Sequence, residues 1–305
     1  MNVKGKRIFV GLSGGVDSAV SAALLKKAGA EVTGVFIKGW YPPEMPCTWA
    51  AERRDAMRVA ARLHIPFLTF DAAEEYKKGV VEYMLSEYRA GRTPNPDVMC
   101  NREVKFGAFY HFAMSKGADA IAMGHYRSGE KDQSYFLWAV PKDVLDKTIF
   151  PVGDKDKKDV RALAKKFNLP VSEKRDSQGV CFLGSVSIKE FLTRELGTDN
   201  PALLYTIGQR MNGEYVVEKD IGNKKIITSK TRGSDIKEIS FIDANWFGEQ
   251  SLATEAQYRY RGQRVRGKIE NNYFISSEAL SEMPASGQSI VFYGNDKLIG
   301  GGIIA

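Results

Sequence analysis

The chain has 305 residues, of which 43% are hydrophobic and 27% charged, a composition typical of a globular enzyme and unlike a disordered chain or a coiled coil. This length predicts two or three domains. No apolar run approaches the roughly 20 residues that span a bilayer, and the segment 1–9 carries no secretory signal. We therefore expect a cytoplasmic protein with no membrane partner.

Charge distribution and cysteine content exclude further classes of protein. The formal net charge is +7, but the segment 198–305 holds 13 basic and 13 acidic residues, so the whole excess precedes it. The three cysteines, Cys47, Cys100 and Cys181, are far apart and form no Cys-x-x-Cys motif. This spacing excludes a disulfide scaffold, a metal site built from cysteine pairs and an iron–sulfur thiolase. Cys47 is interpreted as structural.

The first half of the chain alternates between strand and helix patterns. Residues 6–12 predict a buried strand, and apolar positions at Val16, Val20, Ala23 and Leu24 predict a helix over 16–28. The same patterns predict strands over 31–37, 65–71 and 118–123, and helices over 48–63, 73–89, 102–116, 157–167 and 186–196. Such alternation indicates a parallel sheet covered by helices on both faces.

After residue 198 the pattern becomes all-β. Strand-like runs over 215–217, 225–228, 239–242, 258–266 and 289–293 are separated by Gly, Asn and Asp turns. We expect one small β domain followed by a barrel or sandwich. The predicted domains are 1–197, 198–245 and 246–305.

A glycine- and serine-rich segment, Gly11-Leu12-Ser13-Gly14-Gly15-Val16-Asp17-Ser18, joins the first strand to the first helix. It lacks the Gly-Lys-Ser/Thr ending of a Walker A loop and does not fit Gly-x-Gly-x-x-Gly. Hydroxyl groups, close backbone approach and a helix N-terminus together make an anion pocket, and Asp17 is a candidate ligand for the magnesium that accompanies a pyrophosphate. The alternative is an ordinary β–α turn with a capping Ser or Asp.

Two cysteines lie in different local settings. In Asn95-Pro96-Asp97-Val98-Met99-Cys100, a carboxylate precedes a thiol in a turn that leads into a helix, where a thiol pKa is lowered. Cys181 lies in the turn-rich stretch Asp176-Ser177-Gln178-Gly179-Val180-Cys181-Phe182. The alternative interpretation is two inert buried cysteines.

The glycine-rich segment resembles the PP-loop of the ATP pyrophosphatase superfamily, and the chain as a whole resembles the tRNA-specific 2-thiouridylases. The shared motifs run from the PP-loop through Gly91–Asp97, Gly124-His125-Tyr126, Lys131–Leu137, Asp176–Phe182, Tyr205–Arg210, Arg259–Arg261, Gly287-Gln288 and Gly300–Ile304. The resemblance implies a doubly wound parallel α/β sheet of the PP-loop, adenine nucleotide alpha hydrolase-like type. A short central β domain and a C-terminal β-barrel would follow it.

The resemblance also implies a role for each matched position. ATP would be bound by Gly11, Leu12, Ser13, Gly14, Gly15, Val16, Asp17 and Ser18, with Ile37 and Gly124 contacting adenosine. The target uridine would be bordered by Asn95, Pro96 and Asp97, with Asp97 as general acid or base. Cys181 would carry a persulfide, and Cys100 would discharge it and leave a Cys100–Cys181 disulfide. The residues implied to contact tRNA are His125, Lys131, Asp132, Gln133, Arg259, Tyr260, Arg261 and Gln288. His125 has a structural reading as well.

The implied reaction is 2-thiolation of the tRNA wobble uridine through adenylation of the uracil 2-carbonyl. Its cofactor would be ATP with magnesium, without a tightly bound metal or organic cofactor, and its partners would be tRNA and a persulfide donor such as a cysteine desulfurase or a relay protein. The alternatives are another PP-loop adenylating synthetase or amidotransferase and a catalytically idle tRNA-binding protein. This chain departs from the family in its short central domain, since Tyr205 lies only nine positions after Leu196.

A basic run offers a candidate RNA contact. Arg259, Arg261, Arg264, Arg266 and Lys268 fall within ten residues that contain no acid, and their spacing predicts projection from strand faces. Tyr258 and Tyr260 interleave with them, which suits phosphates and unpaired bases. The alternative is a solvated strand edge.

Overall fold

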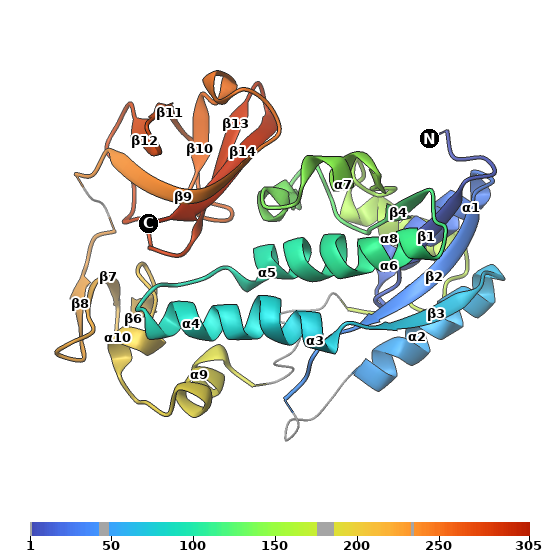
Figure 1. The fold of residues 1–305 in the computed structure, drawn as a ribbon, viewed down its shortest axis with the longest axis horizontal. Coiled ribbons are helices and arrows are strands. Elements are labelled where there is room, and N and C mark those ends of the chain that lie inside the picture. The colour runs from blue at the N-terminus through green and yellow to red at the C-terminus, as the bar shows by residue number, and fades with distance from the viewer. Residues whose placement is uncertain (1, 43–48, 176–185, 233–234) are drawn as a thin grey trace. The chain divides into compact units, whose positions relative to one another are not determined.

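A parallel five-stranded sheet organises the first part of the chain in this computed structural model, which describes residues 2–42, 49–175, 186–232 and 235–305. The sheet order is β3-β2-β1-β4-β5 (Figure 1). Its strands are β1 (Arg7–Gly11), β2 (Glu31–Lys38), β3 (Phe67–Asp71), β4 (Ala120–Ala122) and β5 (Thr148–Ile149). The chain reverses its direction of travel across the sheet between β1 and β4, and ligands of such sheets bind beside the carboxyl ends of the strands at that point.

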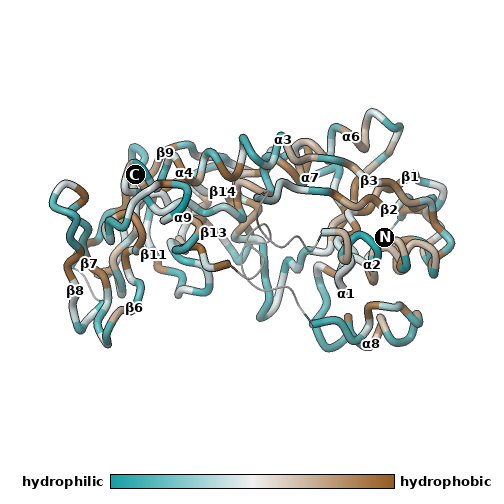
Figure 2. The backbone as a smooth tube through the Cα atoms, turned by 90° about the horizontal axis from the view of Figure 1, so that it is seen from below, coloured by the Kyte–Doolittle hydropathy of each residue, from teal (hydrophilic) through white to brown (hydrophobic). Residues whose placement is uncertain are grey.

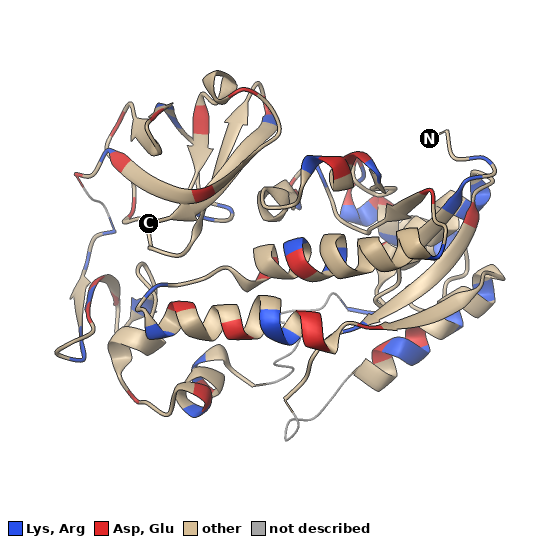
Figure 3. Ribbon diagram, viewed as in Figure 1, with Lys and Arg blue, Asp and Glu red and all other residues tan. Residues whose placement is uncertain are grey.

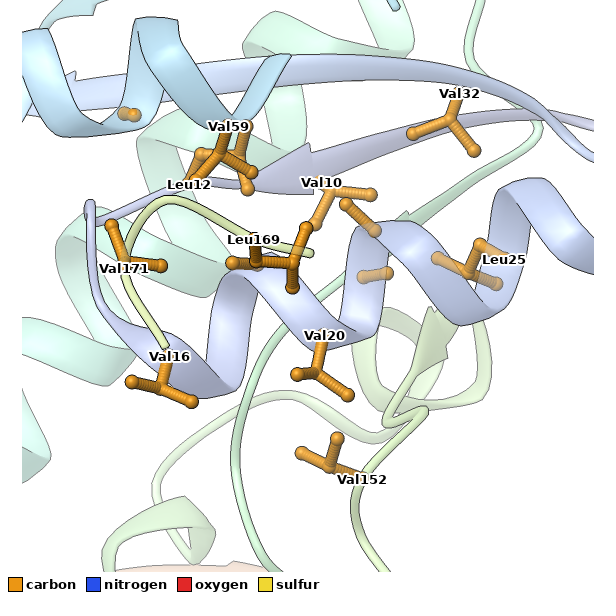
Figure 4. Packing of buried hydrophobic residues seen from close by; sticks show 14 of the residues in the cluster. Val10, Leu12, Val16, Val20, Leu25, Val32, Val59, Val152, Leu169 and Val171 are labelled. Carbon is orange, nitrogen blue, oxygen red and sulfur yellow. The ribbon is translucent and has the colours of Figure 1, made fainter. Parts of the chain in front are cut away.

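Helices cover both faces because the residues of β1 alternate between two cores. Ile8 and Val10 pack in one core with α1 (Val16–Lys27), α2 (Trp49–Leu63) and α8 (Lys157–Lys166) (Figure 4). Phe9 points to the other core, which is formed with η2 (Cys100–Ala108), α6 (Phe109–Ser115) and α7 (Lys142–Asp146). The middle of β1, Ile8–Val10, is apolar and buried, as expected for a strand covered on both faces, and β1 and β2 are largely brown in Figure 2.

The helix predicted over 102–116 begins six residues earlier than expected. It is built from α5 (Pro96–Met99), η2 and α6, of which η2 has π-helical hydrogen bonding. The reason is local, since Asn95 Oδ1 accepts a hydrogen bond from Val98 N at 3.3 Å and proline suits the first helical position. The predicted helix over 73–89 is likewise interrupted, as α3 (Ala73–Tyr76), η1 (Lys77–Glu82) and α4 (Tyr83–Arg89). Cys100 therefore lies in the second turn of its helix instead of at the N-terminus.

The chain divides into two compact units, one of 1–79 with 100–184 and the other of 80–99 with 185–305. The second unit contains α9 (Ile188–Leu196), α10 (Pro201–Leu204) and a three-stranded sheet of β6 (Arg210–Met211), β7 (Glu214–Asp220) and β8 (Lys225–Ser229). A Ser187–Glu190 capping box starts α9, and Gly197 ends it in the left-handed conformation.

The C-terminal strands close into a barrel in the order β10-β11-β12-β9-β14-β13. The strands are β9 (Glu238–Trp246), β10 (Glu255–Gln257), β11 (Val265–Glu270), β12 (Tyr273–Ser276), β13 (Ser289–Gly294) and β14 (Lys297–Ile304), with the short helix η4 (Gln250–Leu252). Phe241, Phe274 and Phe292 fill its interior. The expected boundary at 245/246 falls inside β9, because β9 pairs with both β12 and β14 as a barrel strand.

The strand predicted over 258–266 is wrong. β10 ends at Gln257 and β11 begins at Val265, and the residues between them form a turn closed by Gly262 N donating to Arg259 O at 2.9 Å. Arg261 adopts a left-handed φ of +62° there, which an extended strand does not allow. The pattern was misleading because the two-residue spacing of Arg259 and Arg261 falls in the turn, and only Arg266 and Lys268 of the basic residues lie in β11.

The predicted fold class is confirmed: a doubly wound parallel sheet is followed by a short central β sheet and a β-barrel. Most of the segments that were not predicted have two to five residues, too few to show a hydrophobic period: β5, β6, β10, β12, α7, α10 and the 3-10 helix η3 (Ser134–Leu137). The eight-residue β14 was also not predicted, because three consecutive glycines interrupt its apolar pattern. Within the described residues, no helix is both long and apolar enough to cross a membrane.

Candidate functional site

The loop between β1 and α1 has a shape that its own hydroxyl groups maintain. Ser18 Oγ donates to Gly15 O at 3.2 Å and accepts from Ser13 N at 3.3 Å, and Gly15 N donates to Ser13 Oγ at 3.3 Å. Gly14 has a φ of +74°, and a Cβ there would overlap the backbone oxygen of Glu52 in α2. The loop thus requires glycine at this position for both conformation and space.

The start of α1 presents backbone amides beside this loop. No side chain in the described part of the chain caps the helix, whose N-cap is Gly15. Gly124, which follows β4, packs directly on this turn, since a Cβ there would lie 2.9 Å from Ser18 N. Uncapped N–H groups at the positive end of a helix dipole suit an anion. The structure thus brings Gly124 to the predicted ATP loop, at the point where the sheet order reverses.

Asp17 lies at the centre of a partly buried polar network. Its Oδ1 accepts a hydrogen bond from Tyr126 Oη at 2.7 Å, and Lys157 Nζ donates to Oδ1 and Oδ2 at 2.7 and 2.8 Å. The side chains of Lys157 and Asp17 are 15% and 29% exposed. The predicted magnesium ligand is therefore held in an ion pair here.

A second lysine supports the loop from its other side. Lys174 Nζ donates to Gly14 O at 3.1 Å and pairs with Asp55 of α2 at 2.7 Å. Neighbouring Glu52 has its pKa raised chiefly by burial and further by Asp55, while Lys174 acts in the opposite direction. Many charged residues of this unit lie on its helices, whereas β1 has only Arg7 at its start (Figure 3).

Two further predicted residues lie near the carboxyl ends of the strands. Ile37 is the second-last residue of β2 and is half-buried. It approaches Gly11, where an added Cβ would lie 3.7 Å from Ile37 Cδ1. His125 packs between Phe106 and Phe150, with ring centroids 5.6 and 6.1 Å away. Its Nδ1 is buried without a hydrogen-bond partner in the described chain. Burial first, and then Lys105, lower the pKa of His125 to about 3, so the ring is neutral and offers no charge to a phosphate.

The predicted tRNA contacts at 131–133 also organise their own segment. Gln133 N donates to Tyr126 O at 2.9 Å, and Gln133 Oε1 accepts from Tyr126 N at 3.1 Å. Asp132 Oδ1 accepts from Ser134 N at 2.8 Å. Lys131 is half-buried. Gln133 therefore fixes the backbone of the tyrosine that holds Asp17.

Cys100 is 7% exposed at the start of η2. The next residue is anchored, because Asn101 Nδ2 donates to Phe136 O at 2.9 Å and Asn101 Oδ1 accepts from Lys105 Nζ at 3.2 Å. Cys181 and Cys47 lie outside the described residues.

In the second unit, the segment before Asn95 is fastened to the barrel. Gln288 Nε2 donates to Thr93 O at 2.8 Å and to Pro94 O at 3.1 Å, and Thr93 N donates to Ser286 O at 2.8 Å. Gly287 has a φ of +86°, and a Cβ there would lie 2.9 Å from Thr93 N. Gln288 was expected to touch tRNA, but its side-chain amide donates these hydrogen bonds to the segment that leads to Asn95, Pro96 and Asp97.

The basic turn between β10 and β11 contains one arginine that is bonded within the protein and one that is exposed. Arg259 pairs with Glu282 at 3.3 Å, and its Nη2 donates to Ile207 O at 3.2 Å. Arg261 is exposed, with its guanidinium 5.3 Å from the Tyr260 ring centroid. Arg261 and Tyr260 thus remain candidates for RNA contact, whereas Arg259 supports the turn.

Sequence reasoning missed Lys157 and Lys174 and gave the Tyr126 hydroxyl no role. Tyr126 was part of a quoted motif, and Lys157 opened a predicted helix, but neither pattern shows that they meet Asp17. Their partners lie 109 and 140 residues away in the chain.

Family models match most of the chain. A tRNA methyl transferase HUP domain matches residues 6–130 and 127–185, and an aminomethyltransferase β-barrel domain matches residues 235–304. A protein of Christiangramia forsetii named tRNA-specific 2-thiouridylase MnmA is 40% identical over 310 residues, covering 93% of this chain and 77% of that protein.

A protein of the same name from Oceanobacillus iheyensis is 36% identical over 355 residues, covering 99% of this chain and 96% of that protein. This alignment is longer than the 305 residues of the chain, so the relative carries segments that this chain lacks. Among solved structures, a 4-thiouridine synthetase–RNA complex with bound ATP is 22% identical, covering 65% of this chain and 52% of that chain with a TM-score of 0.40.

Proposed function

The chain belongs to the tRNA-specific 2-thiouridylase family, and from this premise we propose that it uses ATP to replace the 2-carbonyl oxygen of the tRNA wobble uridine with sulfur. The observation that carries the proposal is the loop Gly11–Ser18. It combines a glycine-dependent turn, an uncapped helix start and the close approach of Gly124. These features suit a polyphosphate.

The first step is adenylation. The uracil O2 attacks the α-phosphorus of ATP, the bond to the β-phosphate oxygen breaks, and pyrophosphate leaves. Negative charge grows on the leaving pyrophosphate, and the fixed amides at the start of α1 stabilise it without reorganising. Ile37 and Gly124 border the adenosine, and Ser13, exposed at the loop, donates to a phosphate oxygen.

Magnesium fits this loop only as a companion of the nucleotide. The described residues contain no group of three or more His, Cys, Asp or Glu side chains placed to hold a metal. Asp17 offers one carboxylate, and magnesium commonly takes one or two carboxylates with phosphate oxygens and water. Asp17 would hold the ion, which when bound neutralises phosphate charge.

The second step transfers sulfur. The terminal sulfur of a Cys181 persulfide attacks C2 of the adenylated uridine, and AMP leaves with the former O2. The Cys100 thiolate then attacks Cys181 Sγ, which releases 2-thiouridine and forms a Cys100–Cys181 disulfide that an external thiol reduces. Asp97 acts as general acid or base at the uridine, which Asn95 and Pro96 border.

The proposed partners are tRNA and a persulfide donor, either a cysteine desulfurase or a relay protein, in the cytoplasm. Lys131 and Tyr260 are half-buried and Arg261 is exposed, and we propose all three as RNA contacts. We propose a supporting role for five further residues, because their described contacts are within the protein: Asp132, Gln133, His125, Arg259 and Gln288.

The test combines product analysis with cysteine variants. We expect the wild-type protein, given unmodified tRNA, MgATP and a persulfide source, to yield 2-thiouridine by nucleoside mass spectrometry together with AMP and pyrophosphate. Cys100→Ser and Cys181→Ser each reduce 2-thiouridine to background with nucleotide affinity unchanged, and Cys47→Ser keeps activity. ADP and phosphate as the products would overturn adenylation, and full activity of Cys100→Ser would overturn the paired-cysteine step.

A further inference from the structure

The ion pair between Lys157 and Asp17 joins two helices at the nucleotide loop. Lys157 is the first residue of α8, and Asp17 lies in the first turn of α1. The two helices are packed through one core that includes Val160, Ala164 and Val20. The ammonium is therefore delivered to the loop by a rigid element and is 15% exposed.

The location of this pair is unusual for a purely structural contact. A mostly buried ion pair adds little net stability, since desolvation of both charges offsets their attraction. The pair lies at the uncapped start of α1, beside the amides of the proposed phosphate site. There, Lys157 neutralises a carboxylate that would otherwise repel an incoming polyanion.

Asp17 has a second anchor that does not depend on Lys157. Tyr126 is 3% exposed, its hydroxyl donates to Asp17 Oδ1 at 2.7 Å, and Gln133 fixes its backbone with two hydrogen bonds. The ammonium can therefore leave Asp17 while the carboxylate stays oriented.

From this arrangement we propose that Lys157 is a ligand of the β- and γ-phosphates of ATP. On nucleotide binding, its ammonium exchanges the Asp17 carboxylate for phosphate oxygens, and Asp17, held by Tyr126, is released toward magnesium. Ammonium–phosphate hydrogen bonds are charge-assisted and strong. This inference rests on the proposed ATP-dependent function and adds to it a residue that selects the triphosphate and retains pyrophosphate.

The competing role for Lys157 is a latch that only joins α8 to α1. A latch affects every nucleotide to the same extent, because it acts through the shape of the loop. A phosphate ligand affects only molecules that carry the β-phosphate. The ratio of triphosphate affinity to AMP affinity therefore distinguishes the two roles.

The experiment measures calorimetric binding of AMP, inorganic pyrophosphate and magnesium α,β-methylene-ATP, in which the bond broken in the reaction is replaced. We expect Lys157→Met to weaken binding of the analogue and of pyrophosphate by about tenfold or more, with AMP affinity unchanged within about twofold. Lys157→Arg retains most of the triphosphate preference because it keeps the charge. The matched control is Lys158→Met, an exposed lysine on the same helix, which leaves all three affinities unchanged.

A double variant distinguishes loss of phosphate binding from loss of folding. Asp17→Asn with Lys157→Met removes both charges, so no unpaired carboxylate remains, and it too should lose the triphosphate preference. Equal weakening of AMP and the analogue, or wild-type affinities in Lys157→Met, would overturn the inference while leaving the proposed function standing. Wild-type protein that binds neither AMP nor the analogue would overturn the proposed function and the inference with it.

Discussion

The nucleotide loop of the first unit and Gln288, which is bonded to the Thr93–Pro94 segment of the second unit, were both expected to touch a ligand, yet the two regions use their polar groups differently. At the loop, the helix amides of α1 have no capping side chain in the described chain. At the segment, Gln288 donates to two carbonyls, and Thr93 N donates to Ser286 O. The backbone amides of the first region can donate hydrogen bonds to a ligand, whereas the polar groups of the second region hold that region in position.

This difference separates two kinds of functional residue. A residue that binds a ligand needs donors or acceptors that form no hydrogen bond within the protein. A residue that orients a neighbouring segment instead forms its hydrogen bonds with that segment. Motif resemblance marks both kinds equally, since both are required for activity. Hydrogen-bond partners tell them apart, and the following variants test that division.

The largest effect is expected at Gly14, where an added methyl group would overlap the Glu52 backbone oxygen. We expect Gly14→Ala to weaken nucleotide binding about 100-fold and to destabilise the protein by about 2 kcal/mol or more. The matched control is Gly5→Ala, because Gly5 has nearly the same φ, +73°, with nothing within 4 Å of its Cβ position. Calorimetric binding and denaturant unfolding measure both effects, and equal results for the two variants would contradict the argument from space.

Much of the first region could be predicted from the sequence because its signals are local. The apolar runs of β1 and β2, the glycine-rich turn and the helix after it are each contained within about ten residues, so pattern and structure agree. The helix that begins at Pro96 was predicted to begin at residue 102, because a capping asparagine and a first-turn proline also suit a turn.

The remainder depended on contacts between distant parts of the chain. No local pattern joins Lys157 to Asp17, or Gln288 to Thr93, which lie 140 and 195 residues apart. The segment 258–266 was predicted as a single strand, although it consists of a turn and the first two residues of β11. Periodicity cannot register the positive φ of Arg261, which only the turn geometry sets.

An intermediate effect is expected at Gln288. We expect Gln288→Met, which keeps the side-chain length but removes the donors, to lower kcat for thiolation about tenfold with tRNA affinity unchanged within about twofold. The reason is that Thr93 O and Pro94 O lose the donor that holds the approach to Asn95 and Asp97. Gln250→Met, an exposed barrel glutamine, is the control. Weaker tRNA binding with kcat retained would instead assign Gln288 to direct RNA contact.

The smallest effect is expected in the β10–β11 turn, where two arginines two residues apart should behave differently. Arg261 is exposed, so Arg261→Ala should reduce the slope of log affinity for tRNA against log salt by about one unit. Arg259 pairs with Glu282, whose side chain is only 13% exposed, so Arg259→Ala should change that slope by less than about half a unit. Its main effect should be a loss of roughly 1–3 kcal/mol of unfolding free energy, because Glu282 loses its nearest cation.

The two slopes must be compared with that of a third exposed arginine, because any lost positive charge weakens long-range attraction to RNA. Arg266→Ala, exposed on β11, supplies this baseline. If the Arg261 slope change exceeds the Arg266 baseline and the Arg259 change does not, the turn contacts RNA through Arg261 while Arg259 holds it in shape. Equal slope changes for all three variants would mean that the turn adds only general positive charge, and a larger change for Arg259 than for Arg261 would mean that Arg259 contacts the RNA.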